Sequence, residues 1–329
     1  MAAIEPLERV HFHDVAGGKN ASAITFWRDR ALIAADELAK PLKQNVVQVF
    51  EESGNDWRVG ANGTIVLDER PNASEMDLEG IATDGDTVYV LGSHSWRRKL
   101  HIEDNYVANR LAATNSPEAQ PARDVLLRFT LSSDGSPSHV ERTSLRSYLE
   151  VTEPFQSFSL TASKENGVDA EGLAFWKGSL FVGFRGPVIR GNLTPILKCS
   201  FGQPIQNPEL FFVNLGGRGV RDLAALKKHL LILAGPMGDG PGHFQLYLWD
   251  GRDGVPGGGA PTSPADPGII LIGDVPIPTD AAGRPESGAK AEGLAVFEKA
   301  SGEHHWEVLI VFDGLKNGHA MKYRVEKPQ

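Results

Sequence analysis

Short stretches of alternating hydrophobic and polar residues recur along the chain, and one pattern repeats with little change. Residues 167–187 read GVDAEGLAFWKGSLFVGFRGP: an acidic pair, an apolar stretch, a turn and a second apolar stretch. Nearly the same phrase occurs upstream as MDLEGIATDGDTVYVLGSHS and downstream as AKAEGLAVFEKASGEHHWEVLIVFDG. Alternation with period two, broken by Gly, Asp and Asn, is typical of β-strands joined by hairpins. The pattern therefore predicts a repeated β-unit.

Five copies of this unit align on the first apolar residue of the opener, the short stretch that begins each unit. A third strand follows each hairpin, and further strand-like stretches such as GTIVLD and IILIGDV lie between the copies. LERVHF, near the N-terminus, supplies a matching outer strand for the last unit. We therefore predict an all-β fold: a single five-bladed β-propeller of four-stranded blades with loop insertions, formed by residues 1–329. The aligned opener residues are Ile24, Ile81, Leu173, Leu223 and Leu294.

Two segments interrupt the repeat. SLRSYLE, at 144–150, places Leu145, Tyr148 and Leu149 on one face of a short predicted helix. The insertion near 95–122 is long enough to cover one face of the propeller as a lid. Its presence makes the spacing of the openers uneven, which disfavours WD40 repeats, because these have a nearly constant length.

The composition narrows the range of partners. A net charge of −9 disfavours binding to nucleic acid or to anionic membranes, both of which attract basic surfaces. The single cysteine, Cys199, excludes an intramolecular disulfide, and its apolar surroundings predict a buried thiol. The N-terminal sequence lacks the basic and apolar regions of a signal peptide, and no apolar run approaches the ~20 residues of a membrane helix. We expect a cytoplasmic protein with a small-molecule ligand and no nucleic-acid or membrane partner.

The openers carry charged residues at equivalent places, and equivalent places in propeller blades converge around the central axis. The position two residues before the first apolar residue predicts one ring of side chains. The end of the following strand predicts a second ring. The first ring consists of Ser22, Glu79, Glu171, Arg221 and Glu292, and the second of Asp36, His94, Arg185, Pro236 and Asp313.

Carboxylates that converge without a partner repel one another and raise one another's pKa. A hard divalent cation such as Ca²⁺ or Mg²⁺ would offset this repulsion, with Glu79, Glu171, Glu292 and Asp313 as ligands. Pairing with Arg185 and Arg221 would offset it without a metal. A third alternative is purely structural, with each glutamate accepting hydrogen bonds from backbone N–H groups of a neighbouring blade. The sequence leaves these alternatives open.

The openers also carry a family resemblance. The phrases DLEGIA, DAEGLAF with GFRGP, and KAEGLAVF resemble the bacterial domain-of-unknown-function family 3616 over roughly residues 20–325. More distantly, they are similar to the esterase-like phytase propellers, which share D-x-E-G-[LI]-A openers. The first family has no assigned activity, whereas the second implies hydrolysis of phosphoesters or esters. The sequence has no obvious basic cluster for a hexaphosphate, which argues against phytate as the substrate.

Two functional hypotheses follow. In the first, the protein is a metal-assisted hydrolase of an ester, a lactone or a phosphoester, with its site in the central channel. Asp36 or His94 would then act as general base, and Arg185 or Arg221 would stabilise the developing oxyanion. In the second, the propeller is a non-catalytic scaffold that binds a protein or a small molecule, and the channel acids are structural. Fold alone does not decide, because propellers host many unrelated functions.

Overall fold

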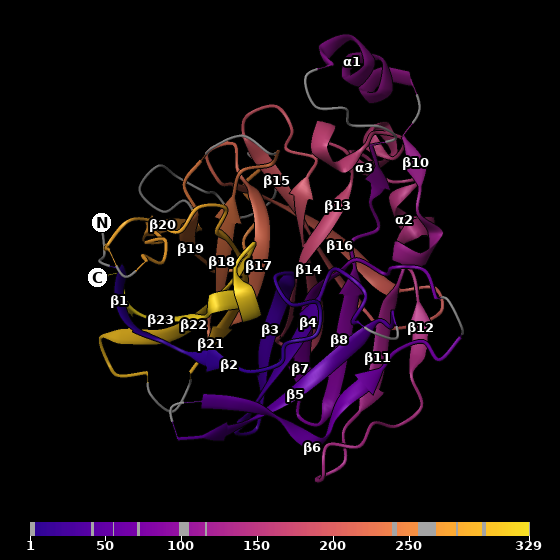
Figure 1. Cartoon of the computed structure of the whole chain (residues 1–329). Coiled ribbons are helices and arrows are strands. Elements are labelled where there is room, and N and C mark those ends of the chain that lie inside the picture. Colours follow the sequence, from indigo (N-terminus) through magenta and orange to yellow (C-terminus); the bar gives the residue numbers. More distant parts are fainter. Residues whose placement is uncertain are drawn as a thin grey trace.

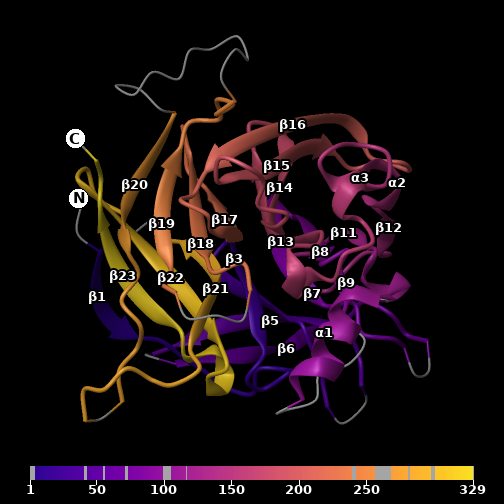
Figure 2. The same ribbon diagram turned by 90° about the horizontal axis from the view of Figure 1, so that it is seen from above.

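The computed structural model describes residues 4–40, 43–54, 56–70, 73–98, 105–115, 117–238, 242–255, 268–280, 282–297 and 301–328. Five antiparallel sheets surround a central axis (Figures 1 and 2). In each of them the three inner strands follow one another from the axis outward, as the repeated unit predicts, and a further strand completes the outer edge. The predicted five-bladed propeller is therefore confirmed.

Each blade contains the four strands that the hydrophobic pattern predicts. Blade 1 is formed by β3 (Ala21–Trp27), β4 (Arg30–Ala35), β5 (Val46–Ser53) and β6 (Asp56–Val66). Blade 2 is formed by β7 (Leu78–Asp84), β8 (Thr87–Gly92), β11 (Leu126–Thr130) and β12 (Glu141–Thr143). Blade 3 is formed by β13 (Asp169–Trp176), β14 (Ser179–Gly186), β15 (Leu193–Ser200) and β16 (Gln206–Asn214). Blade 4 is formed by β17 (Gly219–Ala225), β18 (Leu230–Gly235), β19 (Gln245–Trp249) and β20 (Ile269–Asp274).

Blade 5 joins the two ends of the chain. Its inner strands are β21 (Lys290–Val296), β22 (His305–Asp313) and β23 (Met321–Glu326), and β1 (Ile4–Arg9) is its outer strand. The N-terminal strand pairs antiparallel with β23, with Ile4 opposite Val325, so the predicted outer strand exists. It begins at Ile4 and contains only the first three residues of LERVHF, because the chain leaves blade 5 after Arg9. The next strand, β2 (His11–Phe12), then pairs in parallel with β6 of blade 1. Backbone hydrogen bonds thus link the last blade to the first.

The insertions carry most of the helical structure. The predicted helix near 144–150 is α2 (Arg146–Leu149), whose Leu149 is buried, and α3 (Phe155–Phe158) follows it. The 95–122 insertion contains β9 (Trp96–Arg97), α1 (Tyr106–Asn115) and β10 (Glu118–Ala119), while residues 99–104 lie outside the described part. Three 3₁₀ turns complete the elements: η1 (Pro121–Arg123), η2 (Ser163–Glu165) and η3 (Lys316–His319).

The hydrophobic core lies between the blades and closes the channel. Each inner strand packs against the inner strand of the next blade, and β21 packs against β3 to complete the ring. The five aligned opener residues are at most 3% exposed, so they form an aliphatic layer across the channel. Cys199 lies in β15 and is 1% exposed, and its burial raises the pKa of the thiol to about 12. None of the described helices is long and apolar enough to span a bilayer.

Candidate functional site

The inner strands all deviate from regular pairing at the same place. In blade 2, Leu78 lies opposite Gly92 and Gly80 lies opposite Leu91, so Glu79 is one extra residue. This β-bulge occurs in every blade, and bulges re-aim side chains while leaving one residue outside the ladder. Sequence alignment placed a ring of polar residues here, and the bulge explains how an apolar strand accommodates them. The bulged residues are Ser22, Glu79, Glu171, Arg221 and Glu292.

Close packing between neighbouring blades explains the glycine that follows the bulged glutamate in the EGI and EGL phrases. A Cβ atom built on Gly80 would lie 2.7 Å from Leu173 Cβ of the next blade, which is too close for two carbon atoms. Blade 4 has Asp222 at this position, and its carboxylate accepts hydrogen bonds from the backbone of Leu223 at 2.8 Å and of Leu294 at 2.7 Å. Burial raises the pKa of Asp222 well above its usual range. The bulge region is therefore tightly packed between blades, which fixes the directions of the polar side chains.

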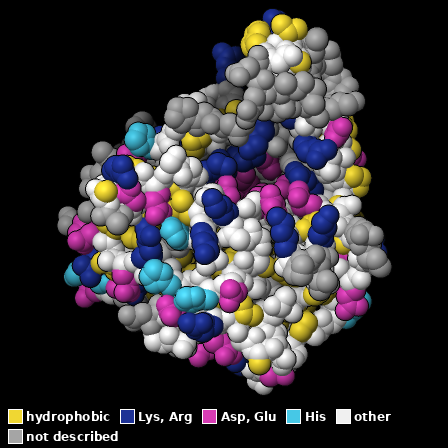
Figure 3. All heavy atoms as spheres, in the orientation of Figure 1, with side chains coloured by type: hydrophobic (Ala, Val, Ile, Leu, Met, Phe, Trp, Pro, Cys, Tyr) yellow, Lys and Arg dark blue, Asp and Glu magenta, His cyan; other side chains and the backbone are white. Residues whose placement is uncertain are grey.

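A cavity of about 430 Å³ lies at this end of the channel. Figure 3 shows carboxylates in a central hollow with lysine and arginine side chains around them. The structure thus brings together basic residues that are dispersed along the sequence and were not predicted as a cluster. The charged residues that line the cavity are the acids Asp36, Glu37, Glu75, Asp77, Glu79, Asp169, Glu171, Glu292 and Asp313 and the bases Arg97, Arg98, Arg123, Lys164, Arg185 and Lys290.

Two arginines hold one half of the acidic ring. Arg221 Nη1 lies 3.2 Å from Glu171 Oε2 and 3.1 Å from Glu292 Oε1, and its other terminal nitrogen donates to the Pro236 carbonyl at 2.7 Å. Arg185 Nη1 lies 2.8 Å from Glu171 Oε1, and Arg185 also pairs with Asp169. Both oxygens of Glu171 are therefore committed to arginines, which satisfies a buried charge.

A third arginine pairs with acids at the edge of blade 2. Arg123 Nη1 lies 2.7 Å from Asp77 Oδ2, and Arg123 Nη2 lies 2.7 Å from Glu75 Oε1. The Ser93 hydroxyl also donates to Asp77 Oδ2 at 2.5 Å. Burial raises the pKa of Asp77, while Arg123 opposes this effect. Asp77 has a φ of +53°, a left-handed conformation that is uncommon outside glycine and is often found at functional sites.

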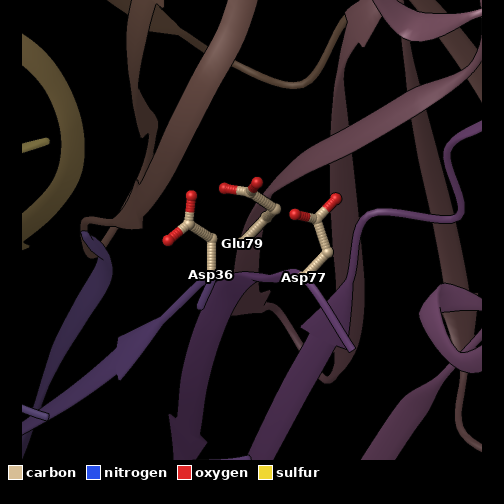
Figure 4. A group of neighbouring side chains, drawn as sticks. All are labelled: Asp36, Asp77 and Glu79. Carbon is tan, nitrogen blue, oxygen red and sulfur yellow. The ribbon is translucent and has the colours of Figure 1, made fainter. Parts of the chain in front are cut away.

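Two further acids, Asp36 and Glu79, lie beside Asp77 and have no basic partner of this kind within the described chain. One carboxylate oxygen from each of Asp36, Asp77 and Glu79 lies within 4.8 Å of the other two, and the three side chains lie side by side in Figure 4. Within the described chain, neither Asp36 nor Glu79 forms an ion pair, and Asp36 Oδ1 is buried without a hydrogen bond. Burial, followed by repulsion from Asp77, Glu292 and Asp313, raises the pKa of Asp36 to about 8. Burial and the same kind of repulsion raise the pKa of Glu79.

Glu292 and Asp313 lie on the blade 5 side of the cavity. Burial raises the pKa of Glu292 to about 7, although Arg221 counteracts part of the increase. Asp313 Oδ2 pairs with Lys290 Nζ at 2.9 Å, and Lys290 remains half exposed at the cavity mouth. A carboxyl group with a pKa near 7 has the protonation equilibrium that general acid–base catalysis requires at neutral pH.

The structure brings most of the predicted site residues to this cavity. Arg221 lies directly behind it, bound to two of the lining glutamates. His94 lies elsewhere: its Nδ1 bonds the Gly92 carbonyl at 2.8 Å, and its Nε2 accepts from Leu145 N at 3.0 Å. Burial lowers the pKa of His94 to about 4, so the imidazole is neutral and fully bonded. The predicted residues that line the cavity are Asp36, Glu79, Glu171, Arg185, Glu292 and Asp313.

Sequence reasoning gave no role to two residues that contribute directly. Asp77 lies four residues before the opener residue Ile81, and only the fold shows that it adjoins Asp36. Arg123 ends η1 at the boundary of the 95–122 insertion, where the repeat gives no signal. Arg97 and Arg98 of the same insertion also line the cavity, so this segment contributes charge to the site.

The sequence matches one family profile. A family described as "Protein of unknown function (DUF3616)" matches residues 20–324. No curated protein matches the chain.

The fold is also similar to solved structures at low sequence identity. A hypothetical protein from Leishmania major is 12% identical with a TM-score of 0.43, and the alignment covers 98% of this chain and 91% of that one. The GH32 β-fructofuranosidase of Bombyx mori is 11% identical with a TM-score of 0.42, covering 98% of this chain and 61% of that one. A GH43 β-1,3-galactosidase is 8% identical with a TM-score of 0.44, covering this whole chain and 62% of the galactosidase.

Proposed function

The chain belongs to the DUF3616 family of proteins of unknown function, and we propose that it is a hydrolase of an ester, a lactone or a phosphoester that acts with a divalent cation. The observation that carries this proposal is the group of Asp36, Asp77 and Glu79. Oxygen ligands of this kind suit Ca²⁺ or Mg²⁺, and a cation would remove the repulsion between them. The buried, unbonded oxygen of Asp36 provides a ligand atom that the protein itself does not satisfy.

The donor set differs from the one that the sequence suggests. Asp36 and Glu79 supply ligand atoms without a basic partner, and Asp77 supplies a third, although Arg123 shares it. Glu171 is a poor ligand because two arginines hold its oxygens. The role of Asp36 therefore changes from general base to metal ligand. A divalent cation at this place would polarise a carbonyl or phosphoryl oxygen and lower the pKa of a bound water.

The other charged residues in and behind the cavity have roles that do not require them to bind the cation. Glu292, with a pKa of about 7, accepts a proton from the attacking water as general base. Arg185 lines the cavity and stabilises the negative charge that develops on the substrate oxygen. Arg221 is a positioning residue, because it holds Glu171 and Glu292 without lining the cavity itself. Lys290 keeps Asp313 paired at the mouth.

A hydrolysis assay tests this proposal. The substrates are p-nitrophenyl acetate, δ-valerolactone and p-nitrophenyl phosphate, each with Mg²⁺, Ca²⁺ or Mn²⁺ and with EDTA. We expect cation-dependent turnover of one class, and a loss of roughly 10²- to 10⁴-fold in kcat for Glu292→Gln. Glu79→Gln is expected to raise the cation concentration needed for activity. Glu69→Gln is the matched control, because Glu69 is exposed and does not line the acidic cavity. Absence of turnover with every cation and substrate contradicts the proposal.

One observation favours the second candidate, a non-catalytic scaffold. The guanidinium of Arg221 joins acids from blades 3 and 5, which is what purely structural channel acids would do. If this candidate is correct, the cavity binds a small molecule without transforming it. Binding of a substrate from the panel without turnover, at any cation concentration, would distinguish it from the hydrolase.

A further inference from the structure

A second cavity, of about 660 Å³, lies on the opposite side of the aliphatic layer. Glu79, Glu171 and Glu292 near the starts of the inner strands line the acidic cavity, whereas residues later in the same strands line this one. No described residue lines both cavities. All five blades contribute to its wall, so it is a concave site on the propeller axis. Its volume is within the range of small-molecule sites in proteins.

The wall of this cavity is aromatic on two sides. Phe26 of blade 1 and Phe297 of blade 5 are in contact, with ring centroids 4.6 Å apart, and Trp57 lies 6.1 Å from Phe26. On the side of blade 3, Phe175 lines the cavity and stacks on Tyr89 at 5.8 Å. Phe26, Phe175 and Phe297 are all only partly buried. Between the two aromatic sides blade 4 contributes small residues, Ala224 and Ala225, which leave space for a ligand.

The charges around this cavity leave an excess of negative charge. Its two cationic side chains are already paired: Arg28 with Asp86 at 2.8 Å, and Lys322 with Glu307 at 2.7 Å. Its two acids, Asp29 and Glu52, are exposed and form no ion pair within the described chain. Lys322 Nζ also lies 5.0 Å from the centroid of the Phe297 ring, so this ring already interacts with one cation of the protein.

We propose that this cavity binds a small organic cation with an apolar body, such as an aryl-substituted quaternary ammonium compound. Aromatic ring faces attract cations, and recognition of quaternary ammonium groups by several aromatic residues is a common use of this attraction. Asp29 and Glu52 add charge complementarity at the rim, and the buried aliphatic layer accommodates the apolar body. The concave position on the axis, with a wall formed by all five blades, favours a small molecule over a protein surface. This site is independent of the proposed hydrolase, since it shares no residue with the acidic cavity.

Calorimetric titration of the full chain with benzyltrimethylammonium chloride tests this proposal. Benzyl alcohol and sodium benzoate, which carry the same ring with no charge and with a negative charge, are the comparison ligands. We expect the cation to bind about tenfold more tightly than benzyl alcohol, and benzoate to bind more weakly than both. Equal binding of the three ligands, or no binding of the cation, would overturn the proposal.

Variants locate the binding. Ala225→Trp fills the cavity at a half-buried position and should abolish binding. The double change Asp29→Asn with Glu52→Gln should weaken binding of the cation several-fold, while Glu69→Gln with Glu326→Gln, which removes two exposed carboxylates outside the cavity, should leave it unchanged. Phe175→Leu keeps an apolar wall but removes the ring, and should cost about threefold in affinity for the cation. Binding that survives Ala225→Trp in a folded protein places the ligand elsewhere and rejects the site. Glu79→Gln should not change binding, which separates this outcome from any failure of the hydrolase proposal.

Discussion

Arg221 and Glu171 lie on neighbouring blades, with Arg221 Nη1 3.2 Å from Glu171 Oε2 and both side chains only 3% exposed. The same nitrogen lies 3.1 Å from Glu292 on the blade on the other side. One guanidinium on blade 4 therefore neutralises acids that point inward from two adjacent blades. The β-bulges direct all three side chains inward, so the pairing depends on the packing of blades 3, 4 and 5 against one another. The network does not reach Asp36 and Glu79, which form no ion pair within the described chain, and the proposed cation binds beside these two acids.

Removing the guanidinium should destabilise the fold. Arg221→Met would leave Glu171 with only Arg185 and Glu292 with no arginine, and an uncompensated buried charge costs about 3–5 kcal/mol. Unfolding in urea, monitored by circular dichroism, measures the change. Lys198→Met is the matched control, because Lys198 pairs with Glu209 on the exposed surface, where such pairs contribute less than about 1 kcal/mol. A loss for Arg221→Met no larger than that of the control would show that the bridge is not structural.

The glycine after the bulge should resist even a small substitution. In Gly80→Ala the new Cβ would meet Leu173 Cβ at 2.7 Å and the Glu171 carbonyl at 3.0 Å, so the two inner strands must separate. Overpacking of this kind typically costs about 1–3 kcal/mol. Gly238→Ala is the control, since its nearest neighbour would lie at 3.6 Å. Thermal melting of both variants measures the difference, and equal melting temperatures would contradict the close packing.

The fold could be predicted from the sequence because every blade has the same packing requirements and therefore repeats a similar residue pattern. The apolar alternation recurs in every blade, and a small residue follows the bulge in every blade except blade 4, which has Asp222. The N-terminal strand supplies the outer strand that the last blade lacks. The pairing within the ring could not be predicted in this way. Sequence alignment shows that Glu79, Glu171 and Glu292 are equivalent, yet Arg221 contacts only the two that flank its own blade.

The remaining errors also have physical reasons. His94 aligns with Asp36 at a strand end, but its imidazole turns toward α2 because the backbone of Leu145 and the Gly92 carbonyl bind both its nitrogens. Arg123 joins the site from an insertion, and no repeat pattern indicates where an insertion places a side chain.

The stability of the cation-free protein should fall as pH rises. The ordinary pKa of an aspartate is 3.8, and burial raises that of Asp36 to about 8, so the folded state holds a proton that the unfolded chain releases. The stabilisation is complete below pH 4 and is lost as pH rises through about 8, and Glu292, with a pKa of about 7, contributes in the same direction. Melting temperatures in EDTA from pH 5 to 9 measure this decline. Asp36→Asn, which cannot ionise, should flatten it, and an unchanged slope would contradict the raised pKa.

The most direct test of the proposed cation site is calorimetric titration of Mg²⁺, Ca²⁺ and Mn²⁺ at pH 8, in two buffers with different ionisation enthalpies. We predict that at least one cation binds to the wild type and that binding releases protons, because Asp36 and Glu79 must ionise to act as ligands. Asp36→Asn and Glu79→Gln should lose most of the affinity. Glu171→Gln is the matched control and should retain affinity, since arginines hold both of its oxygens. Failure of the wild type to bind any of the three cations, or a larger loss in Glu171→Gln than in Glu79→Gln, would contradict a cation site at Asp36, Asp77 and Glu79.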